Sequence, residues 1–311
     1  RLPQVAGAVI TYTGDLGNGQ YVSVVDVSAN SYNPCVAGAQ AAHAADGTHS
    51  GAQQAAGSSK AVTIPQSTLL QDDTTYTVCY AAGSGDSSDT TWRDSYVRLK
   101  ISKIESLAAH MVTHYTDGQI ARVGGTYQSW DGSAYQTVDV ADLELTYSGS
   151  LSEAMWVSLV DQTLNSMQPC DSASEAAGSA GVAYSGPSQA AGGSKVVAVD
   201  TLGMSTTLTF AVCYAEGSGD SSDTTWADSG IRLTVSKVTS VEYGEAHSSL
   251  PVRTWRSTNI MAATNRLPQV AGAVITYTGD LGNGQYVSVV DVSANSYNPC
   301  VAGAQIGRAH V

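Results

Sequence analysis

Short runs of alternating apolar and polar residues recur along the chain. In the run YVRLKISKI (Tyr96–Ile104), Val97, Leu99 and Ile101 are apolar, and the residues between them are polar or charged. A period of two indicates a strand with one buried face. The runs AVITYTG, QYVSVVDVS, KAVTIP and TYTVCY are also rich in β-branched and aromatic residues, and no helical period is sustained. The pattern therefore predicts an all-β chain of short antiparallel strands.

These strands belong to a unit that recurs after about 134 residues. The segment Ile10–Cys35 matches Leu145–Cys170, and Cys79–Ile104 matches Cys213–Val238. Inside the second match, the residues GSGDSSDTTW are identical in both copies. Because an internal repeat decides the architecture, we predict tandem antiparallel β-sandwich modules.

A third copy begins near the end of the sequence. Residues Arg1–Gln40 recur unchanged at Arg266–Gln305, and the hexapeptide IGRAHV (Ile306–Val311) follows. This hexapeptide matches one reading frame of a common sequencing adapter, so we interpret it as a cloning or assembly scar rather than a divergent tail. An alternating pair of modules and an error joining identical reads both explain the third copy. The predicted domains are a first module (1–104), a connector (105–142), a second module (143–238), a connector (239–265), the start of a third module (266–305) and the scar (306–311).

The composition narrows the classes of function. The formal net charge is −13 and the pI about 4.6, so we do not expect the basic surface that a nucleic-acid partner requires. Charged residues make up only 13% of the chain, which suits half-buried strands better than solvent-facing helices. The sequence contains no apolar run of the ~18 residues that a membrane-spanning helix needs.

Four of the five cysteines occupy matched positions in the two modules. We predict one disulfide in each, Cys35–Cys79 and Cys170–Cys213, and hence an oxidising location that is extracellular or at the cell surface. Buried free thiols are the alternative. A zinc site is not expected, because no CxxC motif and no clustered histidine accompanies the cysteines. Cys300 is the first cysteine of the third copy, and its partner position is not in the sequence.

The stretch DDTTYTVCYA, followed by a hairpin and a last strand, resembles the end of an immunoglobulin-like (Ig-like) sandwich. Tyr76 stands three residues before Cys79, whereas the tyrosine corner of that family has two, and no tryptophan occupies the place of the core tryptophan. The resemblance implies modules of Ig-like architecture. The phrase CYAEGSGDSSDTTWADSGIRLTVSK is also similar to repeats of large surface proteins of microalgae and related microbes, which implies an extracellular structural setting.

The repeated GSGDSSDTTW segment carries the main candidates for chemistry. A serine nucleophile needs a base, but all six histidines lie outside the segments that the modules share, so we do not expect an enzyme. Carboxylate oxygens suit calcium, although the spacing differs from an EF-hand loop. The alternative is a hairpin whose side chains satisfy turn backbone groups. The candidate calcium ligands are Asp86, Asp89, Asp94, Asp220, Asp223 and Asp228, and no other cofactor is expected.

We predict a structural subunit of an extracellular fibril or surface filament that assembles with copies of itself. The segment RLPQVAGAVITY (Arg1–Tyr12, repeated at Arg266–Tyr277) is β-prone and lies at a module boundary, so we expect it to complete the sheet of a neighbour by strand donation. The donated side chains are Val5, Ala8, Ile10, Tyr12, Val270, Ala273, Ile275 and Tyr277. The alternative is a cell-surface adhesin or glycan-binding repeat protein, calcium-dependent, that uses its Ala/Gly/Ser-rich loops or the hairpins. Numerous serine and threonine residues leave O-glycosylation open.

Overall fold

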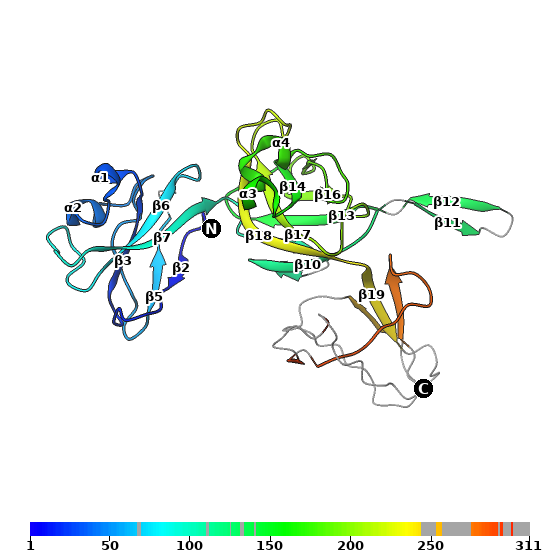
Figure 1. The fold of residues 1–311 in the computed structure, drawn as a ribbon, viewed down its shortest axis with the longest axis horizontal. Coiled ribbons are helices and arrows are strands. Elements are labelled where there is room, and N and C mark those ends of the chain that lie inside the picture. The colour runs from blue at the N-terminus through cyan, green and yellow to red at the C-terminus, as the bar shows by residue number, and fades with distance from the viewer. Residues whose placement is uncertain are drawn as a thin grey trace.

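The computed structural model describes residues 1–66, 70–109, 112–124, 126–130, 134–139, 141–243, 253–256, 275–291, 293–294 and 300. This part of the chain consists mainly of strands with a few short helices, which confirms the all-β prediction. Figure 1 shows two β-rich units side by side, here called the first module (residues 1–102) and the second module (residues 106–236), with a smaller sheet beyond them. The predicted scar, 306–311, lies outside the described residues.

The first module contains a five-stranded sheet and a two-stranded sheet. The five-stranded sheet has the order β1-β7-β6-β3-β4, in which β1 runs parallel to β7 and the other neighbours are antiparallel. The second sheet pairs β2 with β5. The elements are β1 (Leu2–Pro3), β2 (Ala8–Thr11), β3 (Tyr21–Asp26), α1 (Ala29–Tyr32), α2 (Gly38–Ala41), β4 (Gln53–Gln54), β5 (Ala61–Ile64), β6 (Thr75–Ala81) and β7 (Arg93–Ser102).

The second module has the same elements and several more. Its sheets have the orders β10-β18-β17-β14-β15 and β16-β13-β8-β9, and the hairpin β11–β12 projects away from both (Figure 1). The elements are β8 (Ser106–Ala109), β9 (Val112–His114), β10 (Asp117–Ala121), β11 (Thr126–Trp130), β12 (Tyr135–Asp139), β13 (Leu143–Ser148), β14 (Trp156–Asp161), α3 (Leu164–Met167), the short helix η1 (Pro169–Asp171), α4 (Ala173–Ala176), β15 (Ser188–Gln189), β16 (Val196–Val199), β17 (Thr209–Ala215) and β18 (Ala227–Ser236).

The segment 105–142, predicted as a connector, contributes strands to both sheets of the second module. Strand β8 pairs antiparallel with β13, and β10 runs parallel to β18 from Arg232 to Ser236. The side chains of Leu107 and Ile120 enter the core between the sheets. The second module therefore begins directly after the first one ends, and only the β11–β12 hairpin lies outside its sheets.

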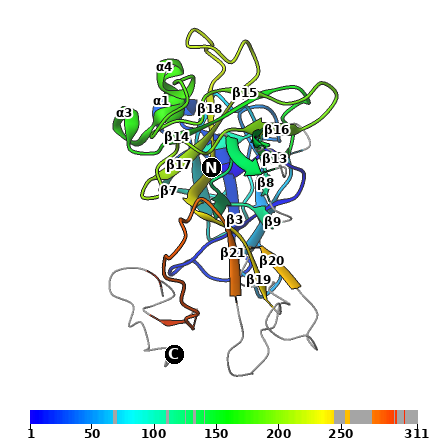
Figure 2. The same cartoon turned by 90° about the vertical axis from the view of Figure 1, so that its right-hand side faces the viewer.

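A three-stranded sheet follows the second module. It consists of β19 (Val238–Tyr243) between β20 (Arg253–Arg256) and β21 (Ile275–Gly279), and both pairings are antiparallel. Figures 1 and 2 both place this sheet below the second module rather than beside the first. Part of the predicted second connector, 239–265, thus pairs with the start of the third copy.

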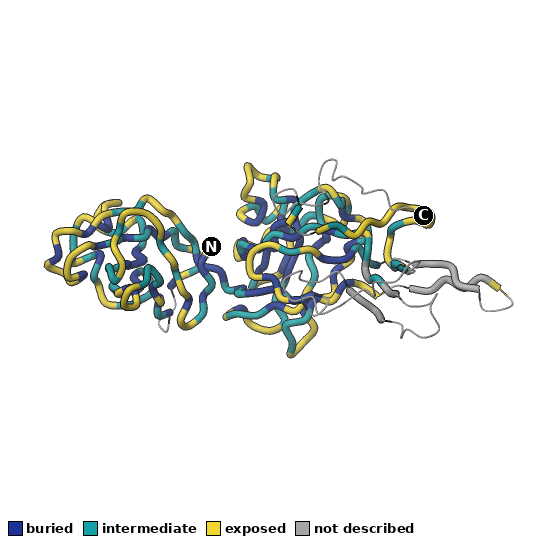
Figure 3. The backbone as a smooth tube through the Cα atoms, turned by 90° about the horizontal axis from the view of Figure 1, so that it is seen from below, coloured by how far each residue is buried: buried dark blue, intermediate teal, exposed yellow. Residues whose placement is uncertain are grey.

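The sheet that carries each disulfide is buried on both faces. Along β17, the side chains of Phe210, Val212 and Tyr214 lie in a core between the two sheets, whereas Ala211 and Cys213 lie in a second cluster on the outer face. Figure 3 shows buried chain running through the interior of both modules. Alternation along a strand thus divides the apolar residues between two cores, because successive side chains point to opposite faces.

The same division occurs in the first module. Tyr76 packs between the sheets, and Cys79 lies in an outer cluster with Cys35, Ala41 and Trp92. The Ala/Gly-rich stretch after Cys35, which its composition predicts to be a surface loop, therefore covers part of this outer face through α2, whose Ala41 is fully buried. Small residues suffice there because helix and strand backbones approach closely.

The last strands of the two modules differ in how far they are covered. The predicted strand Tyr96–Ile104 corresponds to β7, but Val97 is 55% exposed, whereas its counterpart Ile231 in β18 is 1% exposed. The neighbouring strand causes this difference. In the first module β1 pairs with β7 only at Ile101 and Ser102, while β10 follows β18 over five residues.

Candidate functional site at the module junctions

Each junction between modules is a direct continuation of one strand into the next. Strand β7 ends at Ser102 and β8 begins at Ser106, and β18 ends at Ser236 and β19 begins at Val238. A linker of so few residues has little conformational freedom. The last strand of one unit therefore fixes where the first strand of the following unit starts.

The strands that follow the two junctions pair in the same register. Strand β8 places Ser106 opposite Ser148 and Leu107 opposite Tyr147. Strand β19 places Ser240 opposite Thr278, in a pairing that continues to Tyr277 and Ile275. The first strand of each following unit thus adds to the corresponding edge in both cases.

Lys103 holds the first junction together. Its Nζ atom lies 3.3 Å from Asp72 Oδ2 of the first module and also donates a hydrogen bond to Glu216 of the second. Its backbone N–H donates to Tyr214 Oη at 3.1 Å. Burial lowers the pKa of the Lys103 ammonium, but the hydrogen bond to Glu216 and the two carboxylate charges raise it more, so the pKa lies above its usual value. Lys103 therefore remains charged and bridges both modules.

A second contact recurs at both junctions. In the first module, Gln4 follows β1, and its Oε1 atom accepts a 2.6 Å hydrogen bond from Ser150 of the second module. Arg122 occupies the matching position after β10, since the backbone N–H groups of both residues donate to the final serine of the neighbouring last strand. Arg122 forms an ion pair of 3.0 Å with Asp280 of the third copy. Ser150 and Asp280 occupy matching positions in their units, so the residue after β1 and the residue after β10 contact the same position of the next unit at both junctions.

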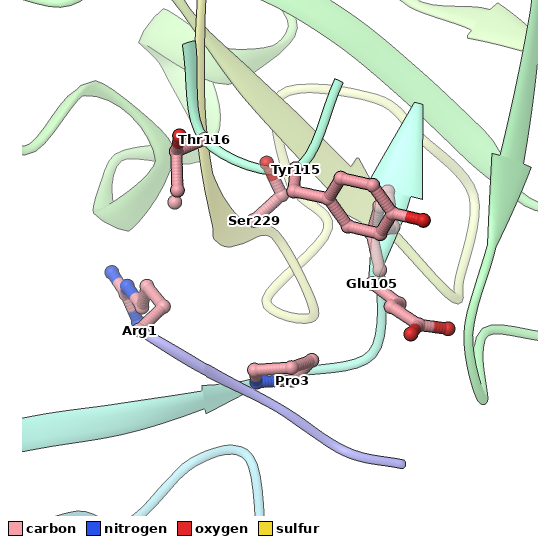
Figure 4. A pocket seen from close by; sticks show the side chains of 8 residues that line it. Arg1, Pro3, Glu105, Tyr115, Thr116 and Ser229 are labelled. Carbon is pink, nitrogen blue, oxygen red and sulfur yellow. The ribbon is translucent and has the colours of Figure 1, made fainter. Parts of the chain in front are cut away.

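Ionic contacts and a small cavity complete the first junction. Arg1 lies 3.8 Å from Asp171 and 3.6 Å from Asp228, and Lys100 lies 3.3 Å from Asp171. Between these segments is a cavity of about 270 Å³. Figure 4 shows Arg1 and Pro3 opposite residues of the β8–β10 segment. The lining residues are Arg1, Pro3, Ile104, Glu105, Tyr115, Thr116, Ser229 and Gly230.

The aspartates of the repeated hairpin bind the hairpin itself. Asp89 accepts hydrogen bonds from the backbone of Gly85 and from both donors of Thr91, at 2.6–2.7 Å. Asp86 accepts both donors of Ser88. These hydrogen bonds lower the pKa values of both carboxyls. The side-chain oxygens thus already accept hydrogen bonds within the turn, as expected if the segment is a hairpin rather than a calcium site.

The last aspartate of each hairpin pairs with an arginine. Asp94 forms two hydrogen bonds with Arg98, and Asp228 forms the same pair with Arg232. Burial raises the pKa of Asp228, but the hydrogen bonds and charge of Arg232 lower it more. Among the described residues, the only group of three close metal-ligating side chains lies elsewhere, so neither set of three aspartates is brought into one ligand shell.

Both predicted disulfides are present. Cys35–Cys79 and Cys170–Cys213 each have a Cα–Cα distance of 5.3 Å. Each bond joins the segment after a short helix to the outer face of its sheet. Cys300 is a free, exposed thiol.

The predicted strand-donating segment lies within its own module. Ala8 and Ile10 belong to β2, which pairs with β5, and Val5 and Tyr12 pack against the same core. In the later copy, Ile275 and Tyr277 belong to β21 and pair with β19. The prediction for Val270 and Ala273 falls outside the described residues.

A histidine-containing group was not anticipated from the sequence. The side chains of His43, Asp46 and His49 converge in the loop that follows α2. Their spacing of three residues was a signal in the sequence, but it becomes meaningful only once the loop folds back on itself. His114 lies buried in β9, and His110 is outside the described residues.

Comparison with family profiles, with curated proteins and with solved structures finds no match. Within the part of the chain that the structure describes, no helix has the length and apolar character needed to cross a membrane. The two intramolecular disulfides favour an oxidising, extracellular environment.

Proposed function

We propose that this chain is part of an extracellular fibril or surface filament built from Ig-like modules of about 134 residues that share strands. The observation that carries the proposal is the direct passage of each last strand into the first strand of the next unit, with one register at both junctions. An array built this way has no flexible linkers. Because the same junction repeats, it extends as a stiff superhelix.

The strand order supports the Ig-like part of the proposal. In Ig domains the first, second, fourth and fifth strands form one sheet, and the third, sixth and seventh form the other, whereas here the short strand β15 pairs with β14 in the second sheet. The orders β16-β13-β8 and β10-β18-β17-β14 of the second module resemble this arrangement. The disulfide departs from it, because it ties a loop to the outer face of one sheet instead of joining the two sheets.

The second module supports strand sharing, because the segment that continues from the last strand of the first module completes both of its sheets. In the second module, the segment 106–121 covers the edge of β13 and the length of β18. In the described part of the first module, β2 pairs with β5 alone, and Val97 of β7 stays exposed. A segment equivalent to 106–121 fits the free edge of β2 and the part of β7 before Ile101, because β1 already pairs with Ile101 and Ser102. We therefore assign strand donation to the segment that follows a last strand, in place of the predicted Arg1–Tyr12.

Electron microscopy of the full chain tests the structural function, and a competing peptide tests strand donation separately. A peptide of residues 104–121, added in excess, should occupy the open edges of the first module and shorten or abolish the filaments. A control peptide with Leu107→Asp and Ile120→Asp should have no effect, because both side chains enter the core. If the chain stays monomeric at every concentration, the filament proposal is rejected. If filaments form and the peptide does not change them, the filament proposal holds and strand donation is rejected.

One observation favours the adhesin as a second candidate. The hairpin β11–β12 projects from the second module, and its sequence, TYQSW and YQTVD, is rich in aromatic and polar residues (Figure 1). Aromatic side chains with polar neighbours are suited to stacking on sugar rings. Deletion of 125–140 should abolish binding to a polysaccharide array with and without calcium if this candidate holds, and unchanged binding would reject it.

A further inference from the structure

The loop between α2 and β4 in the first module brings three metal-ligating side chains together. His43 Nδ1 lies 3.6 Å from Asp46 Oδ2, and His49 Nδ1 lies 3.1 Å from Asp46 Oδ1. The two imidazole rings are 4.5 Å apart between centroids. All three ligand atoms lie within 4.8 Å of one another. We propose that His43, Asp46 and His49 form a binding site for one divalent transition-metal ion, with zinc as the best-suited ion.

The distances fit a tetrahedral ion. With metal–ligand bonds of about 2.1 Å, two ligands of a tetrahedral site lie about 3.4 Å apart. The distances from His43 Nδ1 to Asp46 Oδ2, 3.6 Å, and from His49 Nδ1 to Asp46 Oδ1, 3.1 Å, are close to this value, although they join the two histidines to different oxygens of the carboxylate. Two imidazoles and one carboxylate are ligands that zinc and copper accept, whereas calcium and magnesium prefer oxygen alone. Three protein ligands leave a coordination position for water.

The loop holds Asp46 and His49 in place and leaves His43 free to adjust. Asp46 Oδ1 accepts hydrogen bonds from the backbone of Thr48 and His49, both at 2.7 Å, which fixes the carboxylate. The His49 side chain is only 9% exposed, and its backbone bridges to Val25 of β3. His43 is 48% exposed, and its Nδ1 atom contacts only the Ala44 carbonyl and Asp46. Two ligands are therefore preorganised, and the third can rotate toward the ion.

The hydrogen bonds around Asp46 and His49 leave one ring nitrogen without a partner. Asp46 Oδ1 accepts a further hydrogen bond from Thr48 Oγ1 at 2.9 Å and lies 3.1 Å from His49 Nδ1. His49 Nε2 is buried with no hydrogen-bond partner. Because His49 Nδ1 faces Asp46 Oδ1 at 3.1 Å, an ion bound at Nδ1 would displace the hydrogen between these two atoms, and Nε2 would then carry the ring proton.

The second module provides an internal control. Its loop has the same backbone contacts, because Gly181 and Tyr184 exchange the hydrogen bond that Asp46 and His49 make, and Tyr184 bridges to Val160. The position of His43 is taken by Gly178. The three ligands are thus replaced by glycine, glycine and tyrosine on a matching backbone. The proposed site belongs to the first module and is independent of the proposed filament.

Calorimetric titration of the metal-free full chain with Zn²⁺ tests the site. The wild-type chain should bind one ion, with the His43 and His49 ring proton signals shifting together, and should melt at a higher temperature when loaded. His43→Ala should weaken binding by more than the ~10–100-fold that the loss of an outer-shell partner costs, without unfolding the chain, because His43 is exposed. Failure of the wild type to bind, or unchanged binding by His43→Ala, would overturn the proposal.

A gain-of-site variant in the second module provides the complementary test. The triple substitution Gly178→His, Gly181→Asp and Tyr184→His rebuilds the ligand set there. A side chain at Gly178 would meet the Tyr184 ring at 2.5 Å, and Tyr184→His removes that ring, while Gly181 has open space around it. A folded variant that binds two ions supports the three-residue site. A folded variant that still binds one counts against it.

Discussion

Replacing Gly149 by alanine is expected to loosen the first junction, because this glycine lies directly against the crossing strand. Its φ is +113°, and a Cβ atom there would lie 2.3 Å from the Lys103 carbonyl oxygen and 2.7 Å from the Glu105 backbone nitrogen. All these atoms belong to the backbone, so no side-chain rotation relieves the overlap. The segment that leads into β8 must therefore move.

Gly14 is the matched control. It occupies the same position in the first module with a φ of +109°, but a Cβ atom there would meet nothing within 4 Å. Both alanine variants thus share a backbone cost of roughly 1–3 kcal/mol. Only Gly149→Ala adds the steric overlap, which for overpacked sites costs about 2 kcal/mol and corresponds to about a thirtyfold rise in the open population of the junction.

Trypsin cleavage after Lys103 reports this opening, because a protease cuts the chain only when the strand detaches. In the full chain, we expect Gly149→Ala to be cleaved at Lys103–Ile104 about thirty times faster than wild type, and Gly14→Ala at close to the wild-type rate. Mass spectrometry of the fragments identifies the site. Equal cleavage rates in the two variants would refute the reasoning, since they would show that β8 does not depend on contact with Gly149.

Three further predictions follow from the same structure. Replacing Cys79 by serine should cost the first module about 4 kcal/mol in the chain-entropy argument, measured by urea unfolding, whereas Cys300→Ser should change nothing. The midpoint of thermal unfolding should be constant above about pH 5 and fall as the pH drops through the usual carboxyl pKa of 3.8. The reason is that hydrogen bonds to Asp89 and the charge of Arg232 beside Asp228 lower the pKa values of these carboxyls in the folded state. A midpoint that rises in acid would contradict this. Gly219→Ala should destabilise the second module by more than 2 kcal/mol in urea, because its Cβ would lie 2.1 Å from the Trp156 ring, and a loss below 0.5 kcal/mol would contradict the packing.

The disulfide pairs and the repeated hairpin could be predicted from the sequence because both depend on local or matched signals. Two cysteines at matched positions in each of two copies have only one pairing in which every disulfide lies within a single module. The hairpin is bounded by glycines and filled with aspartate, serine and threonine, whose short side chains return to nearby backbone groups. Strand existence followed from the period of two along β6, β7 and their counterparts.

The strands of the predicted connector could not be found in the same way. Strands β8, β9 and β10 contain four, three and five residues, too few for a period to appear. The partners of β8 and β10 in the two sheets, strands β13 and β18, lie far along the chain, and β10 pairs in parallel. Such pairing depends on the open edges of a sheet formed by later residues, which no local pattern encodes.

The pattern of apolar and polar residues also does not predict the turn that precedes the first cysteine of each module. Asn30 and Ser31, and likewise Asn165 and Ser166, have φ values of +45° to +55°, in the left-handed region that costs a residue with a side chain roughly 1–2 kcal/mol. Asparagine tolerates this conformation better than most residues, but three in succession are unusual, and Tyr32 and Met167 continue the run with φ values of +65° and +69°. The turn redirects the chain so that Cys35 and Cys170 reach the outer face of the sheet, where the disulfide helps to offset the cost.

The identity of GSGDSSDTTW in two otherwise diverged modules has a structural cause at nearly every position. Gly85 has a φ of +69° and lies against the Tyr21 ring, where any Cβ would overlap. Asp89 fixes the backbone of Gly85 and Thr91, and Trp92 is fully buried and donates through Nε1 to the Asp86 carbonyl. A change at any of these positions breaks a contact that the others depend on. In the loop that carries His43 and Asp46, the hydrogen bonds of Asp46 are not required for the backbone path, because glycines hold the same backbone contact in the second module, so these side chains are available for the proposed metal site.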